Sequence, residues 1–314
     1  MKQEIGSKLN VYMAAVYTNN YKPGQKLHED LLDNEKQIMI NIPHILESWH
    51  YVGKQRYVDQ MRADNARVFL DSGAFSAWTL GVKLSVEDYC NYIMRNQDII
   101  RREDGILMAS VLDGIGDPLQ TYRNQLEMEA RGVRPLPCFH ADEDTRYLDY
   151  YVNNYEYITL GGMVGGSVKV LSRWLDQMFE KHICDGAGRP RCKVHGFGIT
   201  SVPLMERYPW FSCDSSSWVQ STAFGMIVTP KFGNLAVSDK SPSIHDKNQH
   251  IATLSDVEQN AVYEMLENAG FTYERLSTVY QSRAAFNVWA YGVIAATINA
   301  TKNPIFRNEI QELI

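Results

Sequence analysis

The stretch Val68-Phe69-Leu70-Asp71-Ser72-Gly73-Ala74-Phe75-Ser76 is a short apolar run that ends in an acid and is followed by a glycine turn. A second stretch, Trp210-Phe211-Ser212-Cys213-Asp214-Ser215, repeats the pattern of an apolar run ending in an acid. Short apolar runs bounded by turn residues are typical of buried parallel strands. The candidate strands of this kind are Val11–Val16, Ile38–Ile42, Val68–Asp71, Ile106–Asp113, Pro135–His140, Tyr157–Gly161, Val194–Ile199 and Phe211–Asp214.

Helical patterns separate these runs and continue to the C-terminal end. Helix-start signals stand at Ser85, at Asp117-Pro118 and at Ser255-x-x-Glu258, where a side chain can cap the first turn. Further helices are expected over Ser167–Lys181 and Ser282–Ala300. Alternating strands and helices indicate an α/β fold with a parallel sheet. We therefore expect one catalytic domain over 1–314: a TIM-type (β/α)8 barrel with a polar loop or insertion at about 231–250 and C-terminal helices at about 256–300.

The composition is that of an ordinary globular protein. The 314 residues are 45% hydrophobic and 22% charged, with a net charge of −6, which excludes a disordered, collagen-like or repeat architecture. No long apolar stretch and no signal-peptide pattern occurs, so the sequence predicts a cytoplasmic protein without a membrane partner. Five cysteines at irregular spacing predict buried thiols rather than disulfides or a metal clip: Cys90, Cys138, Cys184, Cys192 and Cys213.

Polar or glycine residues end several of the candidate strands: Asp71, Asp113, His140, Gly161-Gly162 and Asp214. The carboxyl ends of parallel strands meet at one edge of the sheet, where the reactive groups of barrel enzymes collect. Three carboxylates at one edge predict a catalytic site. The alternative for each aspartate is that it caps the helix that follows.

Taken in order, the strand-end motifs resemble the guanine transglycosylase superfamily, whose members exchange guanine in a polynucleotide for a 7-deazaguanine base. Asp71-Ser72-Gly73-Ala74-Phe75 resembles the family's Asp-Ser-Gly-Gly-aromatic segment. Leu160-Gly161-Gly162-Met163-Val164-Gly165 resembles its Gly-Gly-Leu-Ala-Val-Gly strand end, and His195-Gly196-Phe197-Gly198 its Met-Gly-Val-Gly turn. The resemblance spans about half of the chain.

The resemblance implies two catalytic carboxylates. Asp214 falls where the family has its nucleophile, and a carboxylate can trap the oxocarbenium-like sugar as retaining glycosidases do. Asp71 falls where a second carboxyl group moves protons on the departing and the incoming base.

The resemblance also implies a set of base-binding residues. Asp113 would read the donor edge of guanine, with backbone groups of Gly161, Gly162 and Met163 beside it. His140 stands where the family has a glutamine, and Phe75 and His195 would sandwich the ring. For both histidines the alternative is an ordinary packed or surface side chain.

Departures from the family pattern narrow the class. The tRNA-acting members bind a structural zinc through cysteines that follow the nucleophile, whereas no cysteine follows Cys213 here. The chain thus resembles the phage-type branch, which inserts 7-deazaguanine derivatives such as 7-cyano-7-deazaguanine into DNA as protection against restriction, without metal or other cofactor. The alternatives are a tRNA-specific enzyme without zinc, a non-catalytic nucleic-acid-binding barrel and a nucleoside hydrolase.

A DNA substrate requires a flipped or single-stranded guanine and cations that track the phosphates. The first candidates lie in the basic segment that precedes His195, namely Arg189, Arg191 and Lys193. Arg101, Arg102 and the loop Lys231–Lys247 come next. The alternative is that these residues only keep a surface solvated.

Overall fold

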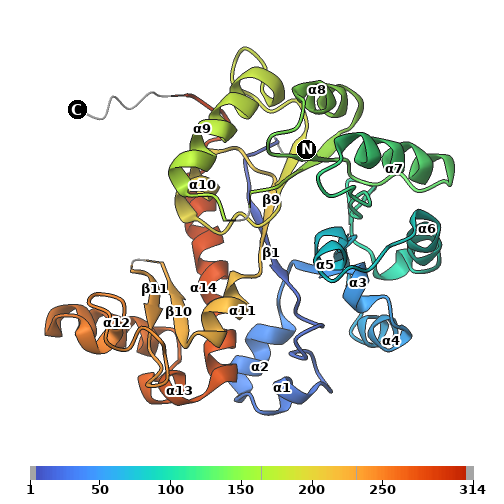
Figure 1. Cartoon of the computed structure of the whole chain (residues 1–314). Helices are drawn as coiled ribbons and strands as arrows, with labels where there is room; N and C mark the ends of the chain where they lie inside the picture. The colour runs from blue at the N-terminus through green and yellow to red at the C-terminus, as the bar shows by residue number, and fades with distance from the viewer. Residues whose placement is uncertain (1–4, 164, 231, 309–314) are drawn as a thin grey trace. The chain divides into compact units, whose positions relative to one another are not determined.

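The computed structural model describes residues 5–163, 165–230 and 232–308, so Val164 of the glycine-rich motif and Lys231 lie outside the described residues (Figure 1). The chain divides into two compact units. Within the described residues, unit 1 comprises 5–18, 44–215 and 298–308, and unit 2 comprises 19–43, 216–230 and 232–297.

Unit 1 is built around a seven-stranded sheet in which every neighbouring pair is parallel. The strand order is β3-β2-β1-β9-β8-β7-β6, so β1 and β9, which lie far apart in the sequence, are neighbours (Figure 1). The strands are β1 (Asn10–Ala14), β2 (Ile45–Ser48), β3 (Val68–Asp71), β6 (Cys138–His140), β7 (Tyr157–Gly161), β8 (Lys193–Gly196) and β9 (Ser212–Ser215).

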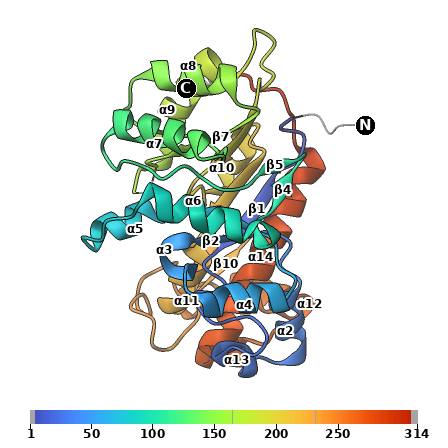
Figure 2. The same ribbon diagram turned by 90° about the vertical axis from the view of Figure 1, so that its right-hand side faces the viewer.

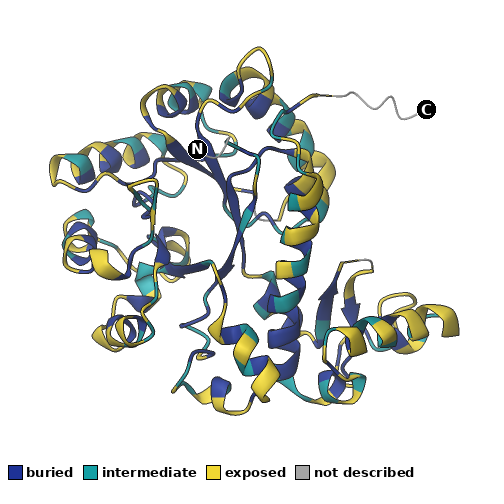
Figure 3. Ribbon diagram, turned by 180° about the vertical axis from the view of Figure 1, so that it is seen from behind, coloured by how far each residue is buried: buried dark blue, intermediate teal, exposed yellow. Residues whose placement is uncertain are grey.

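The sheet is almost completely buried, as the dark blue strands in Figure 3 show. One cluster of buried side chains, from its strands and from residues beside them, forms a hydrophobic core: Tyr12, Ala14, Leu46, Phe69, Met108, Leu136, Tyr157 and Phe211. Because both faces of a parallel sheet are covered, strands such as β3 and β7 read as mainly apolar runs in the sequence. This explains why β3 and β7 have the bounds that the sequence predicts.

The predicted closed (β/α)8 barrel is wrong, because the seven strands form an open, curled half-barrel. The predicted strand Ile106–Asp113 does not form as a unit. A turn at Asp104-Gly105, with φ of 51° and 87°, pairs β4 (Arg102–Glu103) with β5 (Ile106–Leu107) in a separate antiparallel ribbon. Beyond this ribbon only isolated bridges occur, Leu70 to Ala109 and Ser110 to Leu136, where an eighth strand would be needed.

The predicted strand Ile38–Ile42 is also wrong, because its first residues belong to helix α2 (Asp33–Ile40) of unit 2. The Glu35 side chain accepts a hydrogen bond from the Leu32 N–H at 2.8 Å and thereby caps the first turn. Met39 is buried while Ile40 is 41% exposed, which is the pattern of an amphipathic helix. The strand of this region is β2, which begins only after Pro43.

The helices of unit 1 follow the strands as the sequence signals indicate. Ser85, Asp117 and Ser167 each accept a hydrogen bond from a backbone N–H of the first turn. Helices α6 and α7 lie side by side (Figure 2). The helical segments of this unit are α3 (Trp49–Val52), α4 (Gln55–Ala63), α5 (Ala74–Thr79), α6 (Val86–Arg95), η1 (Gln97–Ile99), α7 (Pro118–Ala130), α8 (Thr145–Asn154), α9 (Val168–Met178), η2 (Phe179–Ile183) and α10 (Val202–Arg207).

Unit 2 is mainly helical and contains an antiparallel pair of strands. Part of the predicted polar loop is ordered as β11, which pairs with β10. The Asn287 side chain accepts from the Val228 N–H at 2.7 Å and donates to Thr222 Oγ1 at 3.0 Å, joining α14 to this pair and to α11. The predicted capping box at Ser255 and Glu258 is present. The elements are α1 (Lys26–Glu29), α2, α11 (Ser217–Ala223), β10 (Met226–Thr229), β11 (Gly233–Ala236), η3 (Ile251–Thr253), α12 (Asp256–Asn268), α13 (Tyr273–Thr278) and α14 (Tyr280–Thr301), the last up to residue 297.

All five cysteines are buried free thiols, as the sequence predicts. Among the described residues, no helix combines the length and the apolar character needed to span a membrane.

Candidate active site

The predicted site residues of unit 1 gather at the carboxyl ends of its strands. Asp71 is the last residue of β3, His140 the last of β6 and Gly161 the last of β7. Asp214 is the third residue of β9. Asp113 follows the bridges that Ala109 and Ser110 make between β3 and the segment before β6. Parallel strands therefore bring all these side chains to one edge of the sheet.

Asp71 is held by three hydrogen-bond donors. Its Oδ2 accepts from Ser48 Oγ at 2.9 Å and from the Gly73 N–H at 2.9 Å, and its Oδ1 accepts from Ser110 Oγ at 3.2 Å. Gly73 has φ of 74°, a left-handed conformation that favours glycine, and this turn aims its N–H at the carboxylate.

The electrostatic surroundings of Asp71 favour its protonated form. Burial and the negative charges of Asp113 and Asp214 together raise its pKa to about 6, against the lowering effect of the hydrogen bonds from Ser48 and Gly73. An acid with a pKa near 6 can both donate and accept a proton close to neutral pH.

Asp113 and His140 form an ion pair that a third residue supports. His140 Nε2 lies 3.6 Å from Asp113 Oδ2, and His140 Nδ1 lies 3.0 Å from Glu143 Oε1. Hydrogen bonds to the carboxylates of Asp113 and Glu143 raise the pKa of His140, which favours the positively charged imidazole. Asp113 Oδ1 is buried and has no hydrogen-bond partner among the residues that the structure describes. A buried carboxylate oxygen without a donor is costly, which marks the position where a ligand donor would bind.

Gly161 makes room for this cluster. A Cβ atom at position 161 would lie 2.7 Å from His140 Cδ2 and 3.3 Å from Cys138 Sγ, distances that a side chain cannot adopt without displacing them. The glycine is therefore required by close packing against the His140 ring.

Three side chains of this cluster could also serve as metal ligands: Asp113, Cys138 and His140, whose ligand atoms lie within 4.8 Å of one another. His140 Nε2 lies 3.5 Å from Cys138 Sγ. Burial raises the pKa of Cys138 to about 11, which favours the thiol, whereas a metal requires the thiolate.

Asp214 accepts two hydrogen bonds on one of its oxygens. The Gly198 N–H donates to Oδ1 at 2.9 Å, and His195 Nε2 lies 3.3 Å from the same atom. Asp214 is 7% exposed, whereas His195 has no exposed surface. The His195 ring packs against Phe69 and Phe197, with centroids 4.7 and 4.6 Å apart.

The predicted aromatic sandwich of a base between Phe75 and His195 is not formed in this structure. Phe75 on α5 is 59% exposed and lies beside the exposed Trp78, with ring centroids 6.2 Å apart. His195 instead lies beneath Asp214, enclosed by aromatic side chains. Gly162 is exposed and Met163 is buried directly after β7, so their backbone lies at the predicted edge of the sheet.

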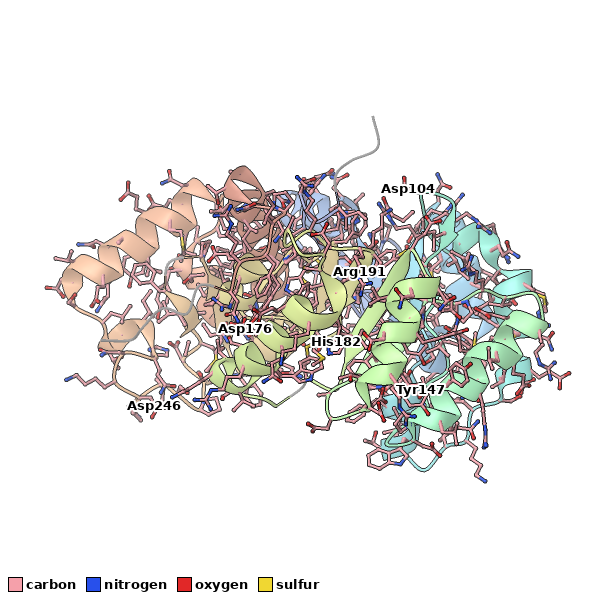
Figure 4. The ribbon with its side chains drawn as sticks, turned by 90° about the horizontal axis from the view of Figure 1, so that it is seen from above. Asp104, Tyr147, Asp176, His182, Arg191 and Asp246 are labelled. Carbon is pink, nitrogen blue, oxygen red and sulfur yellow. The ribbon has the colours of Figure 1, made fainter. Side chains whose placement is uncertain are left out.

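The predicted phosphate-binding residues are at the other end of the strands. Lys193 is the first residue of β8, at its amino end, and its ammonium group forms an ion pair with Asp104 and lies 4.5 Å from the centroid of the Phe211 ring. Arg191, labelled in Figure 4, donates to the backbone carbonyl of His182. Arg189 is exposed in the same segment. The structure therefore does not bring this basic cluster together with the carboxylates.

Sequence reasoning missed several supporting residues. Glu143, Ser48 and Ser110 hold His140 and Asp71 by hydrogen bonds. Ser212 contacts His195 from the strand that carries Asp214. The alternation of side chains along a strand gives a signal for Ser212, since residues two apart share a face. Ser48 and Ser110 both bind Asp71, which lies far from them in the sequence, so no local pattern indicates these contacts.

No protein-family model matches the chain, and a search of curated proteins also finds no match.

Proposed function

We propose that this protein is a DNA guanine transglycosylase, which exchanges guanine for a 7-deazaguanine base through a covalent glycosyl-enzyme. The observation that carries the proposal is the gathering of Asp71, Asp113 and Asp214 at the carboxyl edge of one parallel sheet, where burial and the other two charges raise the pKa of Asp71. The ordered strand-end motifs that resemble guanine transglycosylases support the same assignment.

Asp214 is the nucleophile of the proposed reaction. One carboxylate oxygen attacks C1′ of the target nucleotide, the C1′–N9 bond breaks, and its electron pair leaves with the guanine. Both donors, the Gly198 N–H and His195 Nε2, lie on Oδ1, so among the described residues Oδ2 has no hydrogen-bond partner and can attack.

Asp71 balances the protons of the two half-reactions. Its carboxyl group protonates the departing guanine, and the resulting carboxylate takes the N9 proton of the incoming base as that base attacks C1′ and displaces Asp214. Asp71 is protonated again at the end of the cycle. A pKa of about 6 suits both directions of this transfer.

Asp113 is the base-reading residue of the proposal. Its unpartnered Oδ1 can accept a hydrogen bond from N1–H or from the exocyclic amine of guanine, groups that a 7-deazaguanine also carries. The absence of any cysteine after Cys213 removes the zinc ligands of the tRNA-acting members and favours DNA as the polymer.

The direct test is mass spectrometry of the intact protein after incubation with a guanine-containing single-stranded oligodeoxynucleotide or with tRNA. We expect a protein–DNA adduct. It should disappear when a 7-deazaguanine base is added, because that base attacks C1′ and displaces the protein. An adduct with tRNA alone would show the RNA-acting alternative, and an adduct with neither polymer would contradict the transglycosylase.

Asp113→Asn should weaken base recognition more than bond cleavage. The side-chain amide of the variant places an N–H donor opposite the N–H donors of the base, so the hydrogen bond is lost. We therefore expect the KM of the incoming base to rise on the order of 10²-fold, as for other unpaired polar contacts. The measurement is steady-state incorporation of labelled base, with the exposed Asp88→Asn as the matched control. If the rate of adduct formation fell by the same factor as KM rose, a role in base recognition would be contradicted.

Cations on the carboxyl side of the sheet should bind the DNA phosphates. Lys83, in the loop before α6, and Lys169, at the start of α9, are exposed and follow β3 and β7. We expect Lys83→Ala with Lys169→Ala to lower affinity for an oligodeoxynucleotide about tenfold and to reduce the slope of log K against log salt by about 1 to 2. Arg189→Ala with Arg191→Ala is the control, and a larger effect in that control would restore the basic cluster as the phosphate site.

A further inference from the structure

A continuous chain of buried polar side chains lies beneath Asp214. Tyr157 Oη lies 2.6 Å from Ser212 Oγ, Ser212 Oγ lies 2.5 Å from His195 Nδ1, and His195 Nε2 lies 3.3 Å from Asp214 Oδ1. Tyr157, Ser212 and His195 are each at most 1% exposed. The chain runs from β7 through β9 and β8 to the carboxylate, and aromatic rings enclose its histidine.

The chemistry of these groups fixes the direction of every hydrogen bond. Burial lowers the pKa of His195, so the ring is neutral and carries one N–H. If that proton were on Nδ1, the lone pair of Nε2 would face the Asp214 carboxylate, which is unfavourable. The proton is therefore on Nε2 and donates to Asp214, Ser212 donates its hydroxyl proton to Nδ1, and Tyr157 donates to Ser212.

We propose that His195 is the positioning residue of the nucleophile, and that Ser212 and Tyr157 fix its tautomer. This inference rests on the proposed function, because it assigns Asp214 a reaction to perform. The Nε2–H bond holds Oδ1 in place beside the Gly198 N–H, so that Oδ2 faces the substrate. The histidine of a catalytic triad is oriented in the same way, by a hydrogen bond to the ring nitrogen that does not face the nucleophile.

The arrangement acts in both half-reactions. When Oδ2 becomes bonded to C1′, Oδ1 becomes the ester carbonyl and continues to accept from His195 and Gly198. When the incoming base displaces Asp214, the returning negative charge meets the same two donors without reorganisation. His195 touches no reacting atom and exchanges no proton with the substrate.

The first test needs no substrate. Nitrogen-15 NMR of the free protein reports the tautomer of each histidine, and the His195 signals are those that disappear in His195→Phe. We expect a neutral ring with a protonated Nε2 and an unprotonated Nδ1 at pH 7.5. In Ser212→Ala, where Nδ1 loses its donor, we expect a mixture of tautomers. A protonated Nδ1 in the wild type, or an unchanged tautomer in Ser212→Ala, would overturn the proposal.

The second test measures the rate of adduct formation. His195→Phe fits an aromatic enclosure and removes the donor, so we expect a loss on the order of 10²-fold in rate with little change in KM. His195→Gln, which can place an amide N–H near Asp214, should recover part of that loss. His182→Phe, which changes a histidine paired with Asp149, is the control and should have no effect.

The two tests separate the inference from the function on which it rests. A wild type that forms no adduct with DNA or tRNA contradicts the transglycosylase, while the tautomer result still decides whether the hydrogen-bond chain orients Asp214. A wild type that forms the adduct, together with His195→Phe at the wild-type rate, would overturn the positioning role alone.

Discussion

Asp214→Asn should abolish base exchange and leave the fold intact. The amide has nearly the same shape as the carboxylate and can still accept from Gly198 N–H and His195 Nε2, but it carries no negative charge to attack C1′. We expect the rate of adduct formation to fall on the order of 10⁴-fold or more, the scale found when a nucleophile is removed. The measurement is intact-protein mass spectrometry after incubation with the guanine-containing oligodeoxynucleotide.

Two controls accompany this variant. Asp88→Asn changes an exposed carboxylate of α6 and should form the adduct at the wild-type rate. Circular dichroism and thermal unfolding should show that Asp214→Asn retains the folded structure. Persistent adduct formation in a folded Asp214→Asn protein would assign the nucleophile to another residue.

Asp71→Asn should slow adduct formation and remove the dependence of its rate on pH. Removing a general acid costs on the order of 10²- to 10⁴-fold in rate. In the wild type, the acid form of Asp71 protonates the departing guanine, so the rate of adduct formation should fall as pH rises through about 6, the pKa to which burial raises this group. In Asp71→Asn that decline should be absent. A wild-type profile that is flat between pH 5 and 8 would contradict the role.

The same substitution should stabilise the protein at neutral pH. The pKa of Asp71 is about 6 in the folded protein against an ordinary value of 3.8, so the unfolded chain ionises at lower pH than the folded protein does. The free energy of unfolding of the wild type therefore decreases as pH rises from about 4 to about 6. The contribution lost in this range is not regained at higher pH. We expect Asp71→Asn to unfold with a free energy higher by about 1 to 3 kcal/mol at pH 7.5, and by nearly nothing at pH 4. Denaturant unfolding at the two pH values checks this, and a destabilised variant at pH 7.5 would show that the hydrogen bonds from Ser48 and Ser110 outweigh the burial of charge.

The elements that the sequence predicts best are those with local causes. Strands β3 and β7 match their predicted bounds because each is a mainly apolar run that ends at an acid or a glycine. The helix starts at Ser85 and Asp117 match because a side chain caps a backbone N–H three residues away. These interactions lie within a few residues, so they can be recognised in one sequence.

The wrong predictions arise where a local pattern fits two structures. The residues Ile38-Met39-Ile40 suit a buried strand as well as the end of a helix, and the cap of Glu35 on Leu32 decides for the helix. Likewise, Ile106–Asp113 reads as one strand, but the turn at Asp104-Gly105 turns Ile106–Leu107 back onto β4. The closed barrel was predicted from a strand count, whereas closure depends on continuous pairing between distant segments.

The sequence by itself indicated Asp71 and Asp214 as acids at or near the carboxyl ends of strands, because an apolar run that ends in an acid is visible in a single chain. Asp113 was expected at the end of a strand that does not form, so its place was decided by the tertiary structure. Only the tertiary structure decided how those groups are tuned and supported. Parallel pairing of β3 with β2 brings Ser48 to Asp71, and pairing of β8 with β9 brings His195 to Ser212. It also decided that Lys193 stands at the amino end of β8, because the direction of a strand in the sheet, and not nearness in the sequence, sets which end a side chain occupies.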